Sequence, residues 1–524
     1  MKRNLLWLAA AAAGGVLWGL CFGRDPWLLV PWAALVPLVL LLSLPRRLSL
    51  AAAWVHGMAT WLTAVPWLLH TLTTFGGLPG WLGAVLLLLL AAYLGSYHLA
   101  FVAFGRIIWR LGPGAVLFAL PALWVSLEWL RGVLVTGFPW NLAAYAWADV
   151  PGALPLTAWI GSYGISYLLL MANVGLALGV LRRSWGHAAL GLLLPLLLLA
   201  AGGRWATGGG AASPPVTMVR VIQPNIPNLM DFDSRAVEEN YRSVFDLSRR
   251  ACDHPGALVI WPESAGWPYE FSPAPGVAGR LHRDLEGLAT AGCGVLFNSS
   301  YEERVRGHEE DVHTYNSAYL LAPDGSTERY NKRHLVPWGE YVLLADVLPF
   351  VGKIARQAGN FTAGHELRLL PWQGEQLGVT ICYEAIFPAA VAEQVRQGAT
   401  VLVTISNDAW YGDSVALWQH FRAARFRAAE NRRPMVRAAI TGISGVIAAD
   451  GRVLGRLLPG ERGILPVRLG GRTDLSPYSR HPGWIPGLNA LLAAFAILAG
   501  FRKPYREEPR HDFARNTTEA EQPG

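Results

Sequence analysis

The stretch "GVTICYEAIFP", residues 378–388, places one thiol, that of Cys382, between a β-rich run and a proline. The run 378–381 predicts a strand, and Pro388 favours a helix just after the thiol, because proline is accepted in a first helical turn. In α/β folds, catalytic side chains gather where strands end. Cys382 is therefore a candidate nucleophile, and the alternative is a buried cysteine that only fills space.

The sequence on either side of this stretch continues an α/β pattern. The strands expected in "ALVIWPES" and "ATVLVTISN" are apolar throughout, which is typical of strands covered on both faces. Between the strands we expect helices near 233–252, 277–291, 388–397 and 414–431. Residues 216–470 thus predict an α/β domain.

The whole chain is too apolar for an ordinary soluble enzyme, with 52% hydrophobic and 15% charged residues among 524. A bilayer crossing needs roughly 20 apolar residues. Such windows lie at 4–22, 27–45, 50–70, 80–104, 114–133, 159–182, 187–202 and 484–500. The first window would also fit a signal peptide, but its length and the span directly after it favour an uncleaved anchor.

The windows predict an eight-span helical membrane protein that carries the α/β domain between its seventh and eighth spans. The expected parts are a seven-helix transmembrane domain (1–205), the α/β domain (216–470), a last transmembrane helix (484–500) and a disordered tail (501–524).

Lysine and arginine gather at one set of span ends, and such residues stay on the cytoplasmic side. These residues are Lys2, Arg3, Arg46, Arg47, Arg106, Arg110, Arg182, Arg183, Arg502, Lys503 and Arg506. Both termini are therefore expected in the cytoplasm and the α/β domain on the far side, which in a bacterium is the periplasm. The net charge of +7 follows from these flanks, so no nucleic-acid partner is expected.

Four cysteines, at positions 21, 252, 293 and 382, lack the C-x-x-C spacing of a metal or thioredoxin site. In an oxidising compartment two of the last three could form a disulfide, which would leave one of those three as a thiol.

Glu263 in "IWPES" and Lys332 in "YNKRHLVPWGEY" join Cys382 as candidates. Alone, Glu263 fits a helix cap and Lys332 a solvated cation, although the chain holds only four lysines. Together the three residues supply the groups that acyl transfer requires. A thiol with a free pKa of about 8.5 needs a base, and an ammonium stabilises the oxyanion that forms. A backbone N–H near Tyr383 or Glu384 would assist that ammonium.

At these residues the chain resembles the nitrilase superfamily, whose Glu-Lys-Cys triad sits on an α-β-β-α sandwich in this chain order. It most resembles the membrane-bound apolipoprotein N-acyltransferase family of the bacterial inner membrane. Further matching segments are "GFPWN" (137–141), "QPNIP" (223–227) and "SNDAWYG" (406–412). The resemblance implies that Glu263 is the general base, Lys332 the stabiliser of thiolate and oxyanion, and Cys382 the thioester-forming nucleophile.

The resemblance also implies supporting roles for Glu340, Tyr383 and Glu384, and it matches Trp410 to an aromatic of the family's flexible loops. Phe232 stands where the family can carry a substrate-contacting tryptophan, so any indole N–H contact is lost. Glu340 could instead pair with an arginine or histidine, and Trp410 could be a core aromatic.

Other polar residues are expected to be structural. They are His313, His334, and Glu128 paired with Arg131 near the membrane surface. Residues 337–352 hold an acid followed by an apolar run too short to span, which predicts a lid that dips towards the membrane; the alternative is a buried helix.

The implied reaction moves an acyl chain from a phospholipid, most simply phosphatidylethanolamine, to the α-amino group of the diacylglyceryl-cysteine of an apolipoprotein. The resemblance implies no metal and no cofactor, and we expect a monomer. A membrane-tethered amidase that uses water is the alternative within this chemistry. A transporter or receptor without catalysis would need ionisable residues in several spans, and the spans are nearly free of them.

Overall fold

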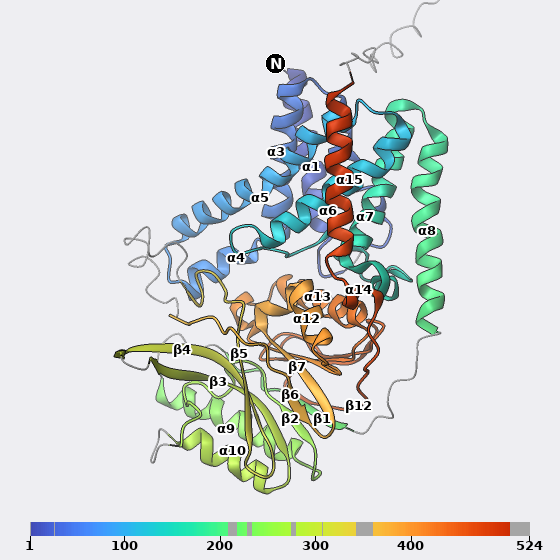
Figure 1. The fold of residues 1–524 in the computed structure, drawn as a ribbon. Coiled ribbons are helices and arrows are strands. Elements are labelled where there is room, and N and C mark those ends of the chain that lie inside the picture. Colours follow the sequence, from blue (N-terminus) through green and yellow to red (C-terminus); the bar gives the residue numbers. More distant parts are fainter. Residues whose placement is uncertain are drawn as a thin grey trace, which may run out of the picture.

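The computed structural model describes residues 2–25, 27–207, 217–227, 233–273, 279–305, 308–341 and 360–503. It consists of a helical part and an α/β part, which lie one above the other in Figure 1. The last helix returns from the α/β part into the helical part, so the two parts are joined twice by the chain.

Long apolar helices make up the first part. Its helices are α1 (Lys2–Leu20), η1 (Val30–Trp32), α2 (Val36–Leu40), η2 (Leu41–Ser43), α3 (Arg46–Ala64), α4 (Trp67–His70), η3 (Thr71–Phe75), α5 (Gly80–Ile108), α6 (Pro113–Val133), η4 (Ala143–Trp147), α7 (Ala153–Arg182), α8 (Trp185–Thr207) and α15 (Trp484–Phe501). Within the described residues, five are long and apolar enough to cross a membrane, and the bent α3–η3 pair makes up to six. The eight predicted spans are therefore confirmed only in part.

Proline explains where the structure departs from the predicted spans. The window 27–45 forms only the short helical stretch Val30–Ser43, in which η1 and α2 begin separately with Pro31 and Pro37 in their first turns. The window 50–70 is split at Pro66, where the chain bends by 60° between α3 and α4. The sequence pattern detected the apolar character of both segments but not their broken geometry.

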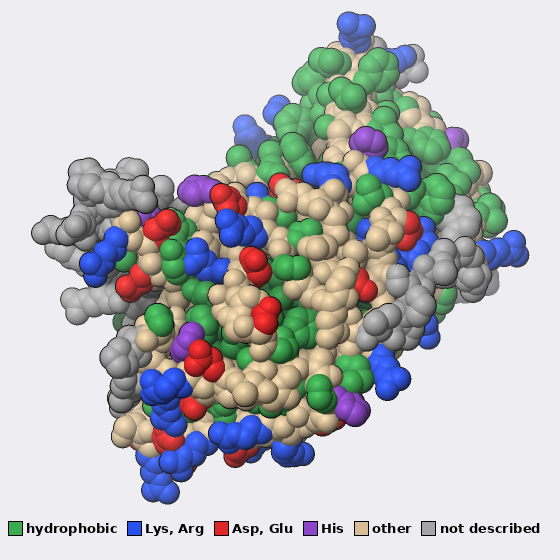
Figure 2. All heavy atoms as spheres, turned by 60° about the horizontal axis from the view of Figure 1, so that its bottom comes forward, with side chains coloured by type: hydrophobic (Ala, Val, Ile, Leu, Met, Phe, Trp, Pro, Cys, Tyr) green, Lys and Arg blue, Asp and Glu red, His purple; other side chains and the backbone are tan. Residues whose placement is uncertain are grey.

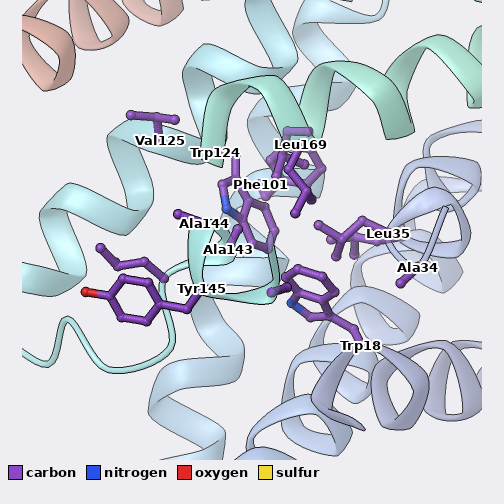
Figure 3. Packing of buried hydrophobic residues seen from close by; sticks show 14 of the residues in the cluster. Trp18, Ala34, Leu35, Phe101, Trp124, Val125, Ala143, Ala144, Tyr145 and Leu169 are labelled. Atoms are coloured by element: carbon purple, nitrogen blue, oxygen red, sulfur yellow. The ribbon is translucent and has the colours of Figure 1, made fainter. Parts of the chain in front are cut away.

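The core of the helical part consists of large apolar side chains from several helices. Figure 3 shows Trp18, Leu35, Phe101, Trp124 and Leu169 packed around one centre, and all five are buried. Such side chains pack closely through many weak contacts that have little directional preference, and this core holds the helices together.

The second part is built on two six-stranded sheets, ordered β12-β1-β2-β3-β4-β5 and β11-β10-β9-β8-β7-β6. The strands are β1 (Thr217–Gln223), β2 (Leu258–Ile260), β3 (Gly294–Val305), β4 (His308–Leu321), β5 (Thr327–Asn331), β6 (Leu370–Trp372), β7 (Glu375–Ile381), β8 (Val401–Ser406), β9 (Met435–Ala439), β10 (Ser444–Ile447), β11 (Val453–Leu457) and β12 (Gly463–Leu469). Parallel pairing occurs at β1–β2–β3 and at β7–β8–β9. The helices are α9 (Ser234–Ala251), α10 (Arg280–Thr290), η5 (Cys382–Ile386), α12 (Pro388–Arg396), η6 (Asp408–Tyr411), α13 (Ala416–Asn431) and α14 (Pro477–Arg480).

Three apolar layers hold the sheets and helices together. The two sheets pack face to face through a cluster that includes Val221, Ile260, Val379 and Val403. Helices α9 and α10 cover the outer face of the first sheet, and α12 and α13 cover that of the second. The predicted α-β-β-α sandwich is thereby confirmed. In Figure 2 charged side chains are scattered over the α/β part, whereas hydrophobic ones dominate the helical part.

A disulfide joins Cys252, which follows α9, to Cys293, which precedes β3. This pairing settles the choice that the sequence left open, and it leaves Cys382 as a free thiol.

Helix α13 forms much of the contact between the two parts. Gln419 accepts hydrogen bonds from the indole N–H groups of Trp67 (3.2 Å) and Trp140 (2.7 Å), and it donates to the carbonyl of Ala64 (2.8 Å). Because α13 also covers the sheet that carries Cys382, it connects the helical part to the centre of the α/β part.

Candidate active site

Cys382 lies at the end of β7, where the chain turns into η5, and its φ of +53° is in the left-handed region. A non-glycine residue there costs about 1–3 kcal/mol and persists only where its surroundings impose it. The side chain is buried, with 6% exposed. The thiol therefore follows a strand, as the sequence predicted, and the backbone is strained at the candidate nucleophile.

Two carboxylates and one ammonium lie together in the same buried region. Nζ of Lys332 donates to Oε1 of Glu340 at 2.8 Å and lies 3.6 Å from Oε1 of Glu263. Lys332 is only 1% exposed and follows β5, whereas Glu263 follows β2. The ends of two strands of the first sheet thus bring Lys332 and Glu263 together, and Glu340 pairs with the lysine rather than with an arginine or histidine.

Asn316 on β4 connects the two carboxylates, and sequence reasoning missed it. Its Nδ2 donates to Oε1 of Glu263 at 2.9 Å and to Oε1 of Glu340 at 2.7 Å. The other oxygen of Glu263 accepts the backbone N–H of Asn407 at 2.9 Å. These donors fix the orientation of the Glu263 carboxylate, and no local pattern around Asn316 could have indicated them.

In this cluster the pKa of the ammonium and the pKa of the thiol are both raised. Burial alone would lower the pKa of Lys332, but Glu340, Glu263 and Cys382 outweigh it and raise that pKa. Burial raises the pKa of Cys382, Glu263 raises it further, and Lys332 opposes both. At neutral pH the resting site therefore holds a charged lysine and a protonated thiol, so attack by sulfur requires removal of a proton.

Glu384 and Tyr383 hold the turn around the thiol. One oxygen of Glu384 accepts the Tyr330 hydroxyl (2.8 Å) and the backbone N–H of Arg333 (2.7 Å), and the other accepts the N–H of Ile381 (2.8 Å). Burial raises the pKa of Glu384. The Tyr383 hydroxyl donates to the carbonyl of Gly137 at 3.1 Å, which ties the turn to "GFPWN".

Trp410 lies at the boundary with the helical part, partly exposed. Its carbonyl accepts the Thr71 hydroxyl at 2.9 Å, and its ring lies 4.9 Å from that of Phe75. Phe232 and residues 342–352 of the predicted lid lie outside the described residues.

The residues expected to be structural do make structural contacts. Glu128 pairs with Arg131 at 4.0 Å and accepts the N–H of Ala143 at 2.7 Å. Nε2 of His334 lies 3.0 Å from the carbonyl of Thr136, and Nδ1 of His313 lies 3.3 Å from the Thr362 hydroxyl. Across the described parts of the chain, no group of three His, Cys, Asp or Glu side chains is placed to hold a metal ion.

Two family models match the chain. Residues 218–470 match the carbon-nitrogen hydrolase family, and residues 14–175 match the N-terminal domain of apolipoprotein N-acyltransferases. The chain thus joins a domain that matches the carbon-nitrogen hydrolase family to apolar helices that match the N-terminal domain of the acyltransferases.

Relatives over nearly the full length define the family more narrowly. The chain is 35% identical to the apolipoprotein N-acyltransferase of Geobacter metallireducens over 511 residues, 93% of this chain and 94% of that one. It is 30% identical to that of Vibrio cholerae over 523 residues, 96% and 97% of the two chains. The chain belongs to the apolipoprotein N-acyltransferase family. Among solved structures, an amidase of the nitrilase superfamily from Nesterenkonia AN1 is 21% identical, covering 52% of this chain and 96% of that one, with a TM-score of 0.38.

Proposed function

We propose that this protein transfers an acyl chain from a phospholipid to the N-terminal α-amino group of diacylated apolipoproteins, through a thioester on Cys382. The observation that carries the proposal is the placement of a strained, free thiol beside Glu263, Lys332 and Glu340 in a chain of this family.

In the first half-reaction Glu263 takes the proton of Cys382, and the sulfur attacks the ester carbonyl of the phospholipid. Lys332 Nζ and the backbone N–H of Tyr383 stabilise the oxyanion that forms. The ester C–O bond then breaks, the leaving lysophospholipid oxygen receives the proton from Glu263, and the acyl chain remains on sulfur.

In the second half-reaction the α-amino group of the diacylglyceryl-cysteine attacks the thioester. Glu263 accepts a proton from that amine, an amide bond forms, and the C–S bond breaks. Cys382 leaves as a thiolate next to Lys332 and regains its proton from Glu263. Glu340 acts by holding the lysine through the 2.8 Å contact, and Glu384 and Tyr383 by holding the turn.

The transmembrane arrangement belongs to the same proposal: parts at 1–205, 216–470 and 484–500, and eight crossings of the inner membrane. The tail predicted at 501–524 lies outside the described residues from position 504 onwards. The window 27–45 would cross as a short, irregular segment. In support, Arg422 of α13 donates to the carbonyls of Gly23 and Arg24, whereas Arg106 donates to those of Leu42 and Leu44. The segment thus runs from the α/β part to the end of α5.

Contacts of another basic residue support the proposed orientation. Arg182 donates to the carbonyls of Trp109 and Leu111, so the basic ends of α5 and α7 lie close together. Positive ends stay cytoplasmic, which puts the α/β part in the periplasm. The Cys252–Cys293 disulfide supports this side, because disulfides persist in oxidising compartments.

The proposal is tested by incubating the purified chain with phosphatidylethanolamine and a diacylated lipopeptide, with Cys382→Ser as the control. Transfer predicts an N-acylated peptide with the wild type and none with the variant. Free fatty acid released at the same rate with and without peptide would instead show that the enzyme is a hydrolase, with water as the acceptor.

A further inference from the structure

Four polar side chains lie behind the Cys382 turn, and the steps above use none of them. Ser406, Asp408, His420 and Arg437 come from β8, η6, α13 and β9, and each is fully buried. Oδ1 of Asp408 accepts the Ser406 hydroxyl at 2.6 Å, and Oδ2 accepts Nη2 of Arg437 at 2.6 Å. We refer to these four residues as the rear cluster.

One member of the rear cluster contacts the backbone of the nucleophile. Nε2 of His420 lies 3.1 Å from the carbonyl oxygen of Cys382. Because a carbonyl oxygen only accepts, Nε2 must carry the proton. Nδ1 lies 3.2 Å from Nη2 of Arg437, a donor, and 3.3 Å from Oδ1 of Asp408. Burial and the Arg437 guanidinium lower the pKa of His420, which keeps the ring neutral with its proton on Nε2.

The carbonyl that His420 holds belongs to the peptide unit between Cys382 and Tyr383. A peptide unit is planar and trans, so its C=O and N–H point in opposite directions. When His420 draws the carbonyl oxygen into the buried side, it turns the N–H of Tyr383 away from the rear cluster. A fixed donor in that direction is what the developing oxyanion requires.

The helical part supports this histidine from its other side. The ring of Trp140, in "GFPWN", lies 5.6 Å from that of His420. The same indole donates through Nε1 to Gln419, the residue that precedes His420 on α13. The position of the imidazole is therefore set by both parts of the molecule.

We propose that His420 is a positioning residue that locks the Cys382–Tyr383 peptide so that the N–H of Tyr383 serves as an oxyanion donor opposite Lys332. The inference rests on the proposed acyl transfer, since it assigns a part of that reaction. Trp140 and the Arg437–Asp408 pair keep the imidazole in place. His420 contacts no reacting atom; it acts through the peptide that it holds.

Two amide variants test this inference. In His420→Gln the side-chain amide reaches about as far as Nε2 of histidine, whereas in His420→Asn it falls short. Single-turnover formation of the Cys382 thioester is followed by intact-protein mass in nanodiscs of phosphatidylethanolamine at several lipid fractions. His282→Gln, on α10, is the matched control outside the rear cluster.

The expected rate for His420→Gln is within about threefold of the wild type, and that for His420→Asn is lower by about 30-fold or more, as for loss of an oxyanion donor. The lipid fraction that gives half the maximal rate should not change, because only the chemical step is affected. Equal rates for the two folded variants, or a loss confined to that lipid fraction, would overturn the inference. If the His420→Asn variant has a lower melting temperature, the His420→Gln variant alone decides. Thioester formation in His420→Gln no faster than the background of Cys382→Ala would refute the inference. Absence of any adduct in the wild type would instead refute the proposed function.

Discussion

Two of the buried charged groups within the described residues differ in their balance of charge. Beside Cys382 there are two carboxylates, those of Glu263 and Glu340, and one ammonium, that of Lys332. At the boundary with the helical part, Arg427 pairs with Glu430 at 2.8 Å, one charge of each sign, and Glu430 accepts the N–H of Ser162 on α7 at 2.7 Å.

The difference teaches what each group is suited to do. A balanced pair satisfies its own charges, and breaking it leaves an unpaired buried ion. An excess of negative charge next to a thiol opposes the thiolate and offers a carboxylate to take its proton. We therefore assign acyl transfer to the unbalanced group and docking of the two parts to the balanced pair, and four predictions test this division.

The largest effect is expected from Glu263→Gln, which keeps the shape of the side chain but removes the base. Formation of the Cys382 thioester should slow by about 10²- to 10⁴-fold, the usual contribution of general-base catalysis. The measurement is single-turnover mass spectrometry with phosphatidylethanolamine. A wild-type rate in this variant would show that the carboxylate next to Lys332 is not the base.

Arg427→Met should act on stability instead. It leaves Glu430 unpaired in a fully buried position, which typically costs about 3–5 kcal/mol. We expect a lower melting temperature in detergent with thioester formation per folded molecule unchanged. A variant of normal stability whose thioester formation is slow would contradict the division between the two groups.

A smaller effect concerns pH. Because burial and Glu263 raise the pKa of Cys382, the thiol stays protonated through neutral pH and becomes a thiolate only above the usual thiol range. Alkylation of Cys382 by iodoacetamide should therefore rise with pH later than that of free cysteine. In Glu263→Gln the profile should move to lower pH, since one negative charge is gone. A profile that is flat from pH 7 upwards would contradict the raised pKa.

The smallest expected effect is that of Tyr383→Phe, which removes the hydrogen bond to the Gly137 carbonyl. One such bond contributes about 0.5–1.5 kcal/mol, so the thioester rate should fall roughly two- to tenfold. Tyr319→Phe, on β4, is the matched control. An effect as large as that of Glu263→Gln would mean that the phenol takes part in the chemistry.

The sequence predicted the members of the site that stand in local patterns. Glu263, Lys332, Glu340 and Cys382 each follow a strand or lie in a short polar segment, and strand ends meet in an α/β fold. Asn316 and His420 were not found, because their partners lie 53 and 38 residues away in the chain and nothing in the surrounding letters marks those contacts.

The same reasoning explains the outcome for the fold. Apolar windows located the helical segments well, since burial in lipid depends on composition over about 20 residues. Window averages do not register a single proline, so the break at Pro66 and the short helices of 30–43 were missed. Likewise, three cysteines allowed several pairings, and only the folded chain brings the residue after α9 next to the residue before β3, where Cys252 and Cys293 are bonded.

The most direct measurement is peptide mapping of the enzyme after brief incubation with phosphatidylethanolamine in the absence of lipopeptide. The account predicts an acyl group in thioester linkage on the peptide that contains Cys382, lost when a diacylated lipopeptide is added. An acyl group on any other residue, or an acylated lipopeptide formed at full rate by Cys382→Ala, would contradict it.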